Sequence, residues 1–97
     1  MTPKTYKIVK TDSFNKDVTR LSEKIRRLDE FIKGVEEVLC RNPRYGKPTK
    51  NKYVLAFNMR SFEENPPLTL YYLHTNVEVV FLFLRADGDA KPPPMIL

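Results

Sequence analysis

The most regular pattern in the chain is a series of apolar residues at helical spacing between positions 14 and 39. Spacings of three and four place such residues on one face of a helix. The residues are Phe14, Val18, Leu21, Ile25, Leu28, Ile32, Val35 and Leu39. Read alone, the series predicts one helix of about 26 residues or a short coiled coil. Two observations favour a hairpin of two helices over about 13–25 and 29–41: Asp29 suits an internal N-cap, and the apolar strands that follow need covering.

The residues outside this series predict four strands. Asp12 or Ser13 is expected to cap the first helix, and Asn42-Pro43 to end the second. Alternating or continuous apolar positions predict strands over 6–11, 52–58, 68–74 and 77–85, with a loop at 44–48. The last strand is apolar on both faces, which is typical of a central strand.

The order of these elements predicts an α+β fold with the sequence β-α-α-β-β-β. The N-terminal strand and the helical hairpin are expected to pack on a small, mainly antiparallel sheet. A single domain is expected over 1–90. Three consecutive prolines at 92–94 then predict an extended C-terminal tail over 91–97, because proline does not fit a helix or a sheet interior.

Composition narrows the class of protein. The 97 residues are 41% hydrophobic, which is enough for one packed core. No apolar run reaches the roughly 18 to 20 residues of a membrane span, and no apolar segment follows the N-terminal lysines, so we expect a cytoplasmic protein without a signal peptide or a membrane partner. One cysteine and one histidine cannot form a disulfide or a structural zinc site. We expect neither a metal nor another cofactor.

The net charge of +5 is unevenly distributed. Residues 1–60 carry 15 basic and 7 acidic side chains, whereas residues 61–97 carry 2 basic and 5 acidic ones. Residues 41–60, here called the basic strip, contain six basic side chains and no acidic one. A field of one sign favours a polyanion such as nucleic acid, or an acidic protein surface. The alternative is an ordinary solvated surface.

Three segments resemble the RelE/ParE superfamily of toxins from type II toxin–antitoxin systems. They are Thr11-Asp12-Ser13-Phe14-x-Lys16-Asp17, Asn42-Pro43-x-x-Gly46-Lys47-Pro48 and Leu70-Tyr71-Tyr72. The likeness extends over about residues 6–88, in the order of elements described above. It implies a toxin held by a cognate antitoxin in a hetero-oligomer. RelE-like members cut messenger RNA in the ribosome without a metal, using the ribose 2′-hydroxyl as nucleophile, whereas ParE-like members inhibit DNA gyrase.

The resemblance and the charge pattern together suggest two groups of site residues. Such cleavage needs proton transfer and stabilisation of charge at phosphorus, which His, Lys and Arg can supply. The expected catalytic residues are Lys50, Lys52, His74 and Arg85. The expected nucleic-acid-binding residues are Arg41, Arg44, Lys47, Arg60 and Tyr72, the last by stacking on a base.

The sequence also departs from the pattern of the nucleases. Leu68 stands where these enzymes tend to carry an arginine, and Arg85 is the one basic residue at the end of the last strand. Whether the protein is an enzyme therefore stays open at this point. The alternatives are a non-catalytic protein on the same fold, such as a gyrase inhibitor or a degenerate toxin, and a small basic nucleic-acid-binding protein.

Overall fold

The structure is a computed structural model that describes residues 5–59 and 66–86. Its elements, in chain order, are β1 (Lys7–Lys10), α1 (Asp12–Ser22), α2 (Leu28–Arg41), β2 (Lys47–Pro48), β3 (Leu55–Met59), β4 (Leu68–His74) and β5 (Glu78–Ala86). Arg60, the expected domain boundary at 90 and the expected tail at 91–97 lie outside the described residues. Within the described ranges, no helix is long and apolar enough to cross a membrane.

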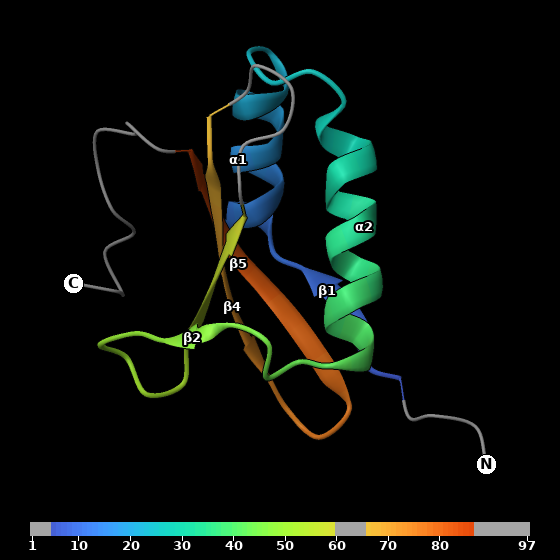
Figure 1. Ribbon diagram of the computed structural model, residues 1–97, viewed down its shortest axis with the longest axis vertical. Helices are drawn as coiled ribbons and strands as arrows, with labels where there is room; N and C mark the ends of the chain where they lie inside the picture. Colours follow the sequence, from blue (N-terminus) through green and yellow to red (C-terminus); the bar gives the residue numbers. More distant parts are fainter. Residues whose placement is uncertain (1–4, 60–65, 87–97) are drawn as a thin grey trace.

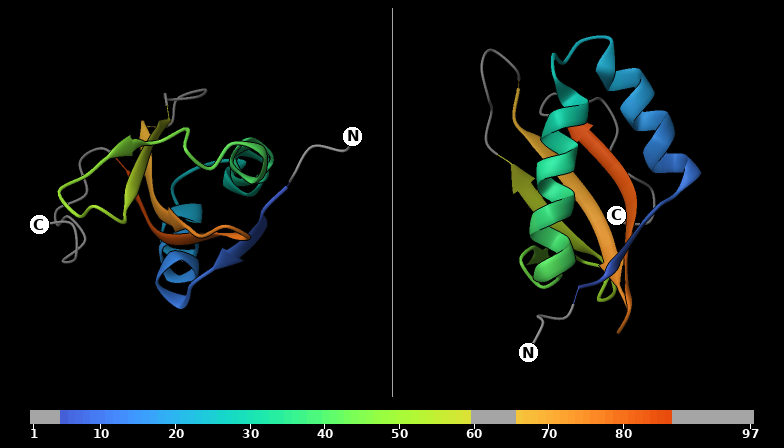
Figure 2. Two further views of the ribbon diagram at one scale, coloured as in Figure 1. Left: turned by 90° about the horizontal axis from the view of Figure 1, so that it is seen from below. Right: turned by 90° about the vertical axis from the view of Figure 1, so that its right-hand side faces the viewer.

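The strands form one sheet in the order β1-β5-β4-β3-β2, and both helices lie on the same side of it (Figures 1 and 2). The pairs β2–β3, β3–β4 and β4–β5 are antiparallel. Strand β1 pairs parallel with β5. A parallel pair needs a long crossover between its strands, and the helical hairpin begins that crossover here. The α+β class with a mainly antiparallel sheet is confirmed.

The hydrophobic core lies between the helices and one face of the sheet. Both helices contribute their apolar faces, and the helix-facing side of β4 contributes Leu68, Leu70 and Tyr72, which are all at most 2% exposed. Phe14 of α1 meets Phe81 of β5 edge-on, with ring centroids 5.2 Å apart. The apolar series between 14 and 39 is therefore a core surface, as predicted.

A β-bulge in β5 changes which residues face this core. Tyr72 pairs with Phe81, but Tyr71 pairs with Phe83, so Leu82 has no partner in β4. A bulge residue shifts the alternation of side chains by one position. Before the bulge, the odd-numbered residue Phe81 faces the core; after it, the even-numbered residue Leu84 does.

Both helix starts differ from the predictions. The N-cap of α1 is Thr11, and Asp12 and Ser13 lie inside the helix. The Thr11 hydroxyl accepts a hydrogen bond from the Phe14 amide at 3.2 Å and donates one to the Phe81 carbonyl at 2.9 Å, so contact with β5 decides where the helix begins. Helix α1 also ends at Ser22 and not at 25.

The predicted cap at Asp29 is also wrong. Helix α2 begins one residue earlier, after Arg27, which has a left-handed backbone with φ of 59° and no side-chain cap hydrogen bond. The Arg27 guanidinium instead pairs with Glu30 in the first turn at 2.7 Å. The sharp reversal between the helices thus falls at Arg27.

The basic strip contains a strand that the prediction missed. Lys47 and Pro48 form the short edge strand β2, which pairs with Leu55 and Ala56 of β3. The expected strand over 52–58 is instead β3 at Leu55–Met59. Lys50 and Lys52 consequently lie in the turn between β2 and β3 and not on a strand.

Candidate functional site

The basic strip runs along one edge of the sheet. Arg41 ends α2, Arg44 follows in the loop, Lys47 lies on the edge strand β2, and Lys50 and Lys52 lie in the next turn. All five side chains are exposed. Within residues 5–59 and 66–86, none of them is part of a salt bridge. The edge therefore presents positive charge that no described acidic group neutralises.

Local hydrogen bonds hold the turn that carries Lys50 and Lys52. The Thr49 hydroxyl lies 2.9 Å from the Val54 carbonyl and 3.0 Å from the Asn51 carbonyl. The Tyr53 amide donates to the Asn51 side chain at 3.0 Å. Both lysines of this turn are exposed. The Lys52 ammonium lies over the Tyr53 ring, 5.0 Å from its centroid.

Tyr72 fixes the basic strip to the sheet from the inside. Its hydroxyl donates to the Pro43 carbonyl at 2.7 Å and accepts from the Gly46 amide at 2.8 Å. Gly46 has to be small, because a Cβ there would lie 2.7 Å from the Tyr72 hydroxyl and 3.0 Å from the Ala56 carbonyl. Burial raises the pKa of Tyr72 above its ordinary value of 10.0, against the opposing effect of the Gly46 hydrogen bond.

The expected stacking role of Tyr72 is therefore wrong. The side chain is 0% exposed and belongs to the core. Tyr71 is the member of the pair that faces away from the helices, in a cross-strand row with Ala56 and Phe83 that ends at Lys47 on β2. The sequence held a signal for this assignment. Alternate residues of a strand face the same side, so Tyr72 faces inward with Leu68 and Leu70.

Arg85 is held by a carboxylate that the sequence analysis did not single out. Asp17 of α1 is 7% exposed, and its Oδ1 accepts a hydrogen bond from Arg85 Nη1 at 2.8 Å. Its Oδ2 accepts from the Leu84 backbone amide at 2.9 Å. Arg20 lies 3.6 Å from the same carboxylate. The sequence signal was an acidic residue three positions after Phe14 and four before Leu21, which is the spacing of a buried helix face.

His74 lies far from Arg85 along the sheet. His74 lies two residues after Tyr72 and so faces the same side of β4. Its ring meets that of Tyr6 edge-on, with centroids 6.4 Å apart. Arg85 pairs with Thr69, five residues before His74, which corresponds to about 17 Å along the strand. In the described part of the chain, no hydrogen bond or ion pair connects any two of His74, Arg85, Lys50 and Lys52. The four expected catalytic side chains are thus not assembled into one cluster.

The described residues contain no group of three or more His, Cys, Asp or Glu side chains that could hold a metal ion.

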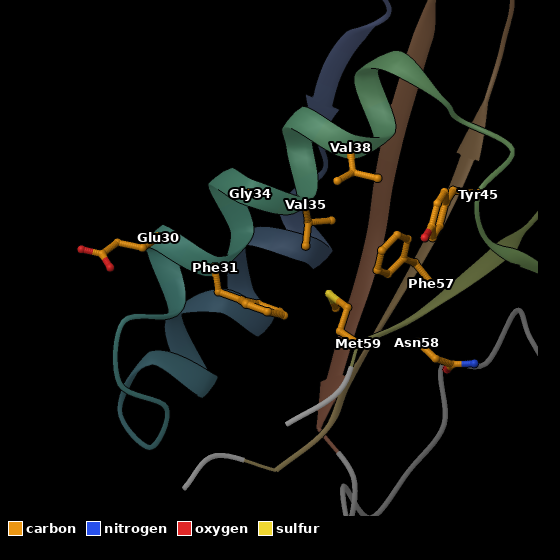
Figure 3. A pocket seen from close by; sticks show the side chains of 9 residues that line it. All are labelled: Glu30, Phe31, Gly34, Val35, Val38, Tyr45, Phe57, Asn58 and Met59. Carbon is orange, nitrogen blue, oxygen red and sulfur yellow. The ribbon is translucent and has the colours of Figure 1, made fainter. Parts of the chain in front are cut away.

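An apolar groove separates α2 from β3 (Figure 3). Its volume is about 510 Å³. The wall formed by α2 includes Val35 and Val38, and the opposite wall includes Tyr45, Phe57 and Met59. Tyr45 and Phe57 stack with centroids 5.3 Å apart, and Val38 and Tyr45 are 40% and 61% exposed. Gly34 leaves open space, since a Cβ there would meet nothing within 4 Å.

Comparison with known proteins shows a similarity in fold. No model of a protein family and no curated protein matches the sequence. The chain is similar in structure to a chain of the RelBE2 toxin–antitoxin complex from Mycobacterium tuberculosis, with a TM-score of 0.65 and 21% sequence identity. The match covers 88% of this chain and 94% of the other. The order of elements and the position of the helical hairpin agree with this similarity, and the chain has a RelE-like fold.

Proposed function

We propose that this protein is the toxin of a toxin–antitoxin pair and that a cognate antitoxin protein neutralises it in a hetero-oligomer. The RelE-like fold supports the proposal, because the similar chain comes from a toxin–antitoxin complex. The exposed charge of the basic strip supports it as well, because its five described cations pair with no described acidic group. Such an edge suits an acidic antitoxin segment and a polyanionic target equally, so the two could compete for one surface.

The proposed target is RNA, and the proposed activity is that of a ribosome-dependent mRNA endoribonuclease that inhibits translation. The observation that carries this proposal is the run of exposed cations from Arg41 to Lys52, none of which pairs with an acidic residue in the described part of the chain. Cations that are not paired within the protein can replace the counterions of phosphate groups. Tyr71 lies on the same face of the sheet as Lys47, the face that points away from the helices, and offers a ring for base stacking. Metal-independent attack by the ribose 2′-hydroxyl fits this set of groups.

A second candidate is a toxin of the same fold that binds its target without cutting it, as a gyrase inhibitor does. Two observations favour it. The Arg85 guanidinium is already paired with Asp17, and His74 lies five residues along β4 from Thr69, the partner of Arg85. A toxin that only binds its target needs the charged surface but no cluster of acid, base and cation, and the described residues form no such cluster. A small basic protein without toxicity is the third interpretation to be tested.

Induced expression in a bacterial host distinguishes these functions. We expect growth to stop on induction and to recover when an antitoxin encoded beside the gene is co-expressed. Mapping of transcript 5′ ends should then show new ends within coding sequences. Growth arrest with intact transcripts would overturn the nuclease and favour the binding toxin. Normal growth, together with salt-dependent binding of the purified protein to naked RNA or DNA, would overturn the toxin and favour the third interpretation.

A further inference from the structure

The groove between α2 and β3 combines features of a surface that binds proline-rich segments. Its lining includes three aromatic rings, those of Phe31, Tyr45 and Phe57. Grooves lined by aromatic side chains bind polyproline II segments, which lose little entropy on docking because proline restricts the backbone beforehand. Gly34 leaves part of the α2 wall open, so a bound backbone can approach the helix closely. One charged residue, Glu30, lines the groove.

The chain itself carries a segment of matching chemistry. The sequence beyond the described residues includes Lys91-Pro92-Pro93-Pro94 followed by Met95, Ile96 and Leu97. The proposed function gives this segment no role. Three prolines favour the polyproline II conformation, and the last three residues are apolar, like most of the residues that line the groove. The single basic residue of this segment, Lys91, is opposite in charge to Glu30.

The sheet register brings the end of β5 close to the groove. Ala86 pairs with Leu68, and Leu68 pairs with Met59, which lines the groove. Neighbouring strands are about 4.8 Å apart, so the last residue of β5 lies about 10 Å from Met59. Eleven residues follow Ala86, and a chain of that length spans up to about 36 Å when extended. The tail is therefore long enough to enter the groove and to run along it.

We propose that the C-terminal segment 91–97 of this chain docks in cis in the groove between α2 and β3. The prolines contact the aromatic wall, and the terminal apolar residues cover Val38 and its neighbours. A tethered segment has a high effective concentration at its own groove, so a modest intrinsic affinity is enough for docking. A protein partner that binds at this groove must then displace the tail. This proposal is independent of the toxin activity.

Nuclear Overhauser effects in the full-length protein test the docking. We expect effects between the methyl groups of Ile96 or Leu97 and those of Val38, and between the prolines and the Tyr45 ring. The cross-strand effect between Leu70 and Leu84 serves as a positive control. Its presence without any effect between tail and groove would overturn the proposal.

Substitutions and mixed samples identify the occupant. Changing Ile96 and Leu97 to aspartate leaves the groove intact and should shift the Val38 and Tyr45 signals, but not those of Val77, which is 63% exposed in the β4–β5 turn. Unchanged Val38 and Tyr45 signals would count against the proposal. In a mixture of isotope-labelled and unlabelled protein, isotope-filtered spectra should show no effects between tail and groove. Such effects between molecules would mean that a second copy occupies the groove, and would overturn docking in cis.

Discussion

The carboxylate of Asp17 joins α1 to strand β5 through the guanidinium of Arg85, with Oδ1 and Nη1 2.8 Å apart. The same carboxylate accepts the Leu84 amide. Strand β1 pairs with β5 no further than Phe81, so this side chain supplies an acceptor to β5 beyond the end of β1. Asp17 is thus a structural residue, and its loss leaves both a cation and a backbone donor without their partner.

Replacing Asp17 with alanine should destabilise the protein strongly. Removing one partner of a buried, hydrogen-bonded charge pair leaves the other uncompensated, so we expect the free energy of unfolding to fall by about 2–4 kcal/mol. Urea denaturation followed by circular dichroism measures the change. Asp12→Ala is the matched control, since Asp12 is exposed in the first turn of the same helix. Equal stabilities of the two variants would refute the structural role of Asp17.

Replacing Tyr72 with phenylalanine should loosen the attachment of the basic strip. The change deletes the hydroxyl that joins Pro43 and Gly46 to β4 and should lower the free energy of unfolding by about 1–3 kcal/mol. Tyr71→Phe is the control on the neighbouring position, where the side chain faces away from the core, and should change stability far less. Amide hydrogen exchange at Gly46 should become faster in the Tyr72 variant alone.

The raised pKa of Tyr72 predicts a specific loss of stability in alkaline solution. Burial keeps the phenol protonated in the folded state at pH values where the unfolded chain ionises it. The folded state therefore binds more protons above about pH 10, and its stability falls as the pH rises through that region. Unfolding curves from pH 8 to 11 measure the effect. The stability difference between the wild type and Tyr72→Phe should shrink above pH 10, and a constant difference would contradict the assignment.

The two described glycines of the site should respond oppositely to alanine. Gly46→Ala places a methyl group against the Tyr72 hydroxyl and the Ala56 carbonyl, so we expect a loss of about 1–3 kcal/mol. Gly34→Ala meets no atom within 4 Å and improves the helix propensity of α2, so we expect a gain of about 0.5–1 kcal/mol. Thermal unfolding measures both changes. A neutral Gly46 variant would show that the close approach does not constrain this position.

The hydrophobic pattern predicted the fold because its strongest signals were local. Strand β4 has the predicted bounds, since Leu68, Leu70 and Tyr72 alternate with half-buried residues over its length. The helical hairpin was predicted from apolar spacing and from the need to cover the strands. Its caps were not, because Thr11 caps α1 while bonded to Phe81, seventy residues away in the sequence.

The candidate site was less predictable because tertiary contacts arrange it. The two-residue strand β2 contains a proline and has no periodicity, so only its pairing with β3 reveals it. The basic strip was visible as charge, and the structure leaves its five described cations exposed. The ion pair of Arg85 depends on Asp17, which is remote in the sequence, and the separation of His74 from Arg85 depends on strand register. Spacing could show that Asp17 lies on the buried face of α1, but neither spacing nor composition shows its pairing with Arg85.

Cell-free translation tests the central claim that the basic strip is the working surface of a toxin directed at translation. Purified wild type should reduce protein synthesis. A triple variant with Lys47→Ala, Lys50→Ala and Lys52→Ala should not inhibit, because it loses three exposed positive charges of the basic strip. The control variant removes the same charge from exposed sites on or beside the helices: Lys16→Ala, Lys24→Ala and Lys33→Ala. We predict inhibition by the wild type and by the control variant, and none by the strip variant when circular dichroism shows it folded. Equal inhibition by all three proteins, or none by the wild type, would contradict the account.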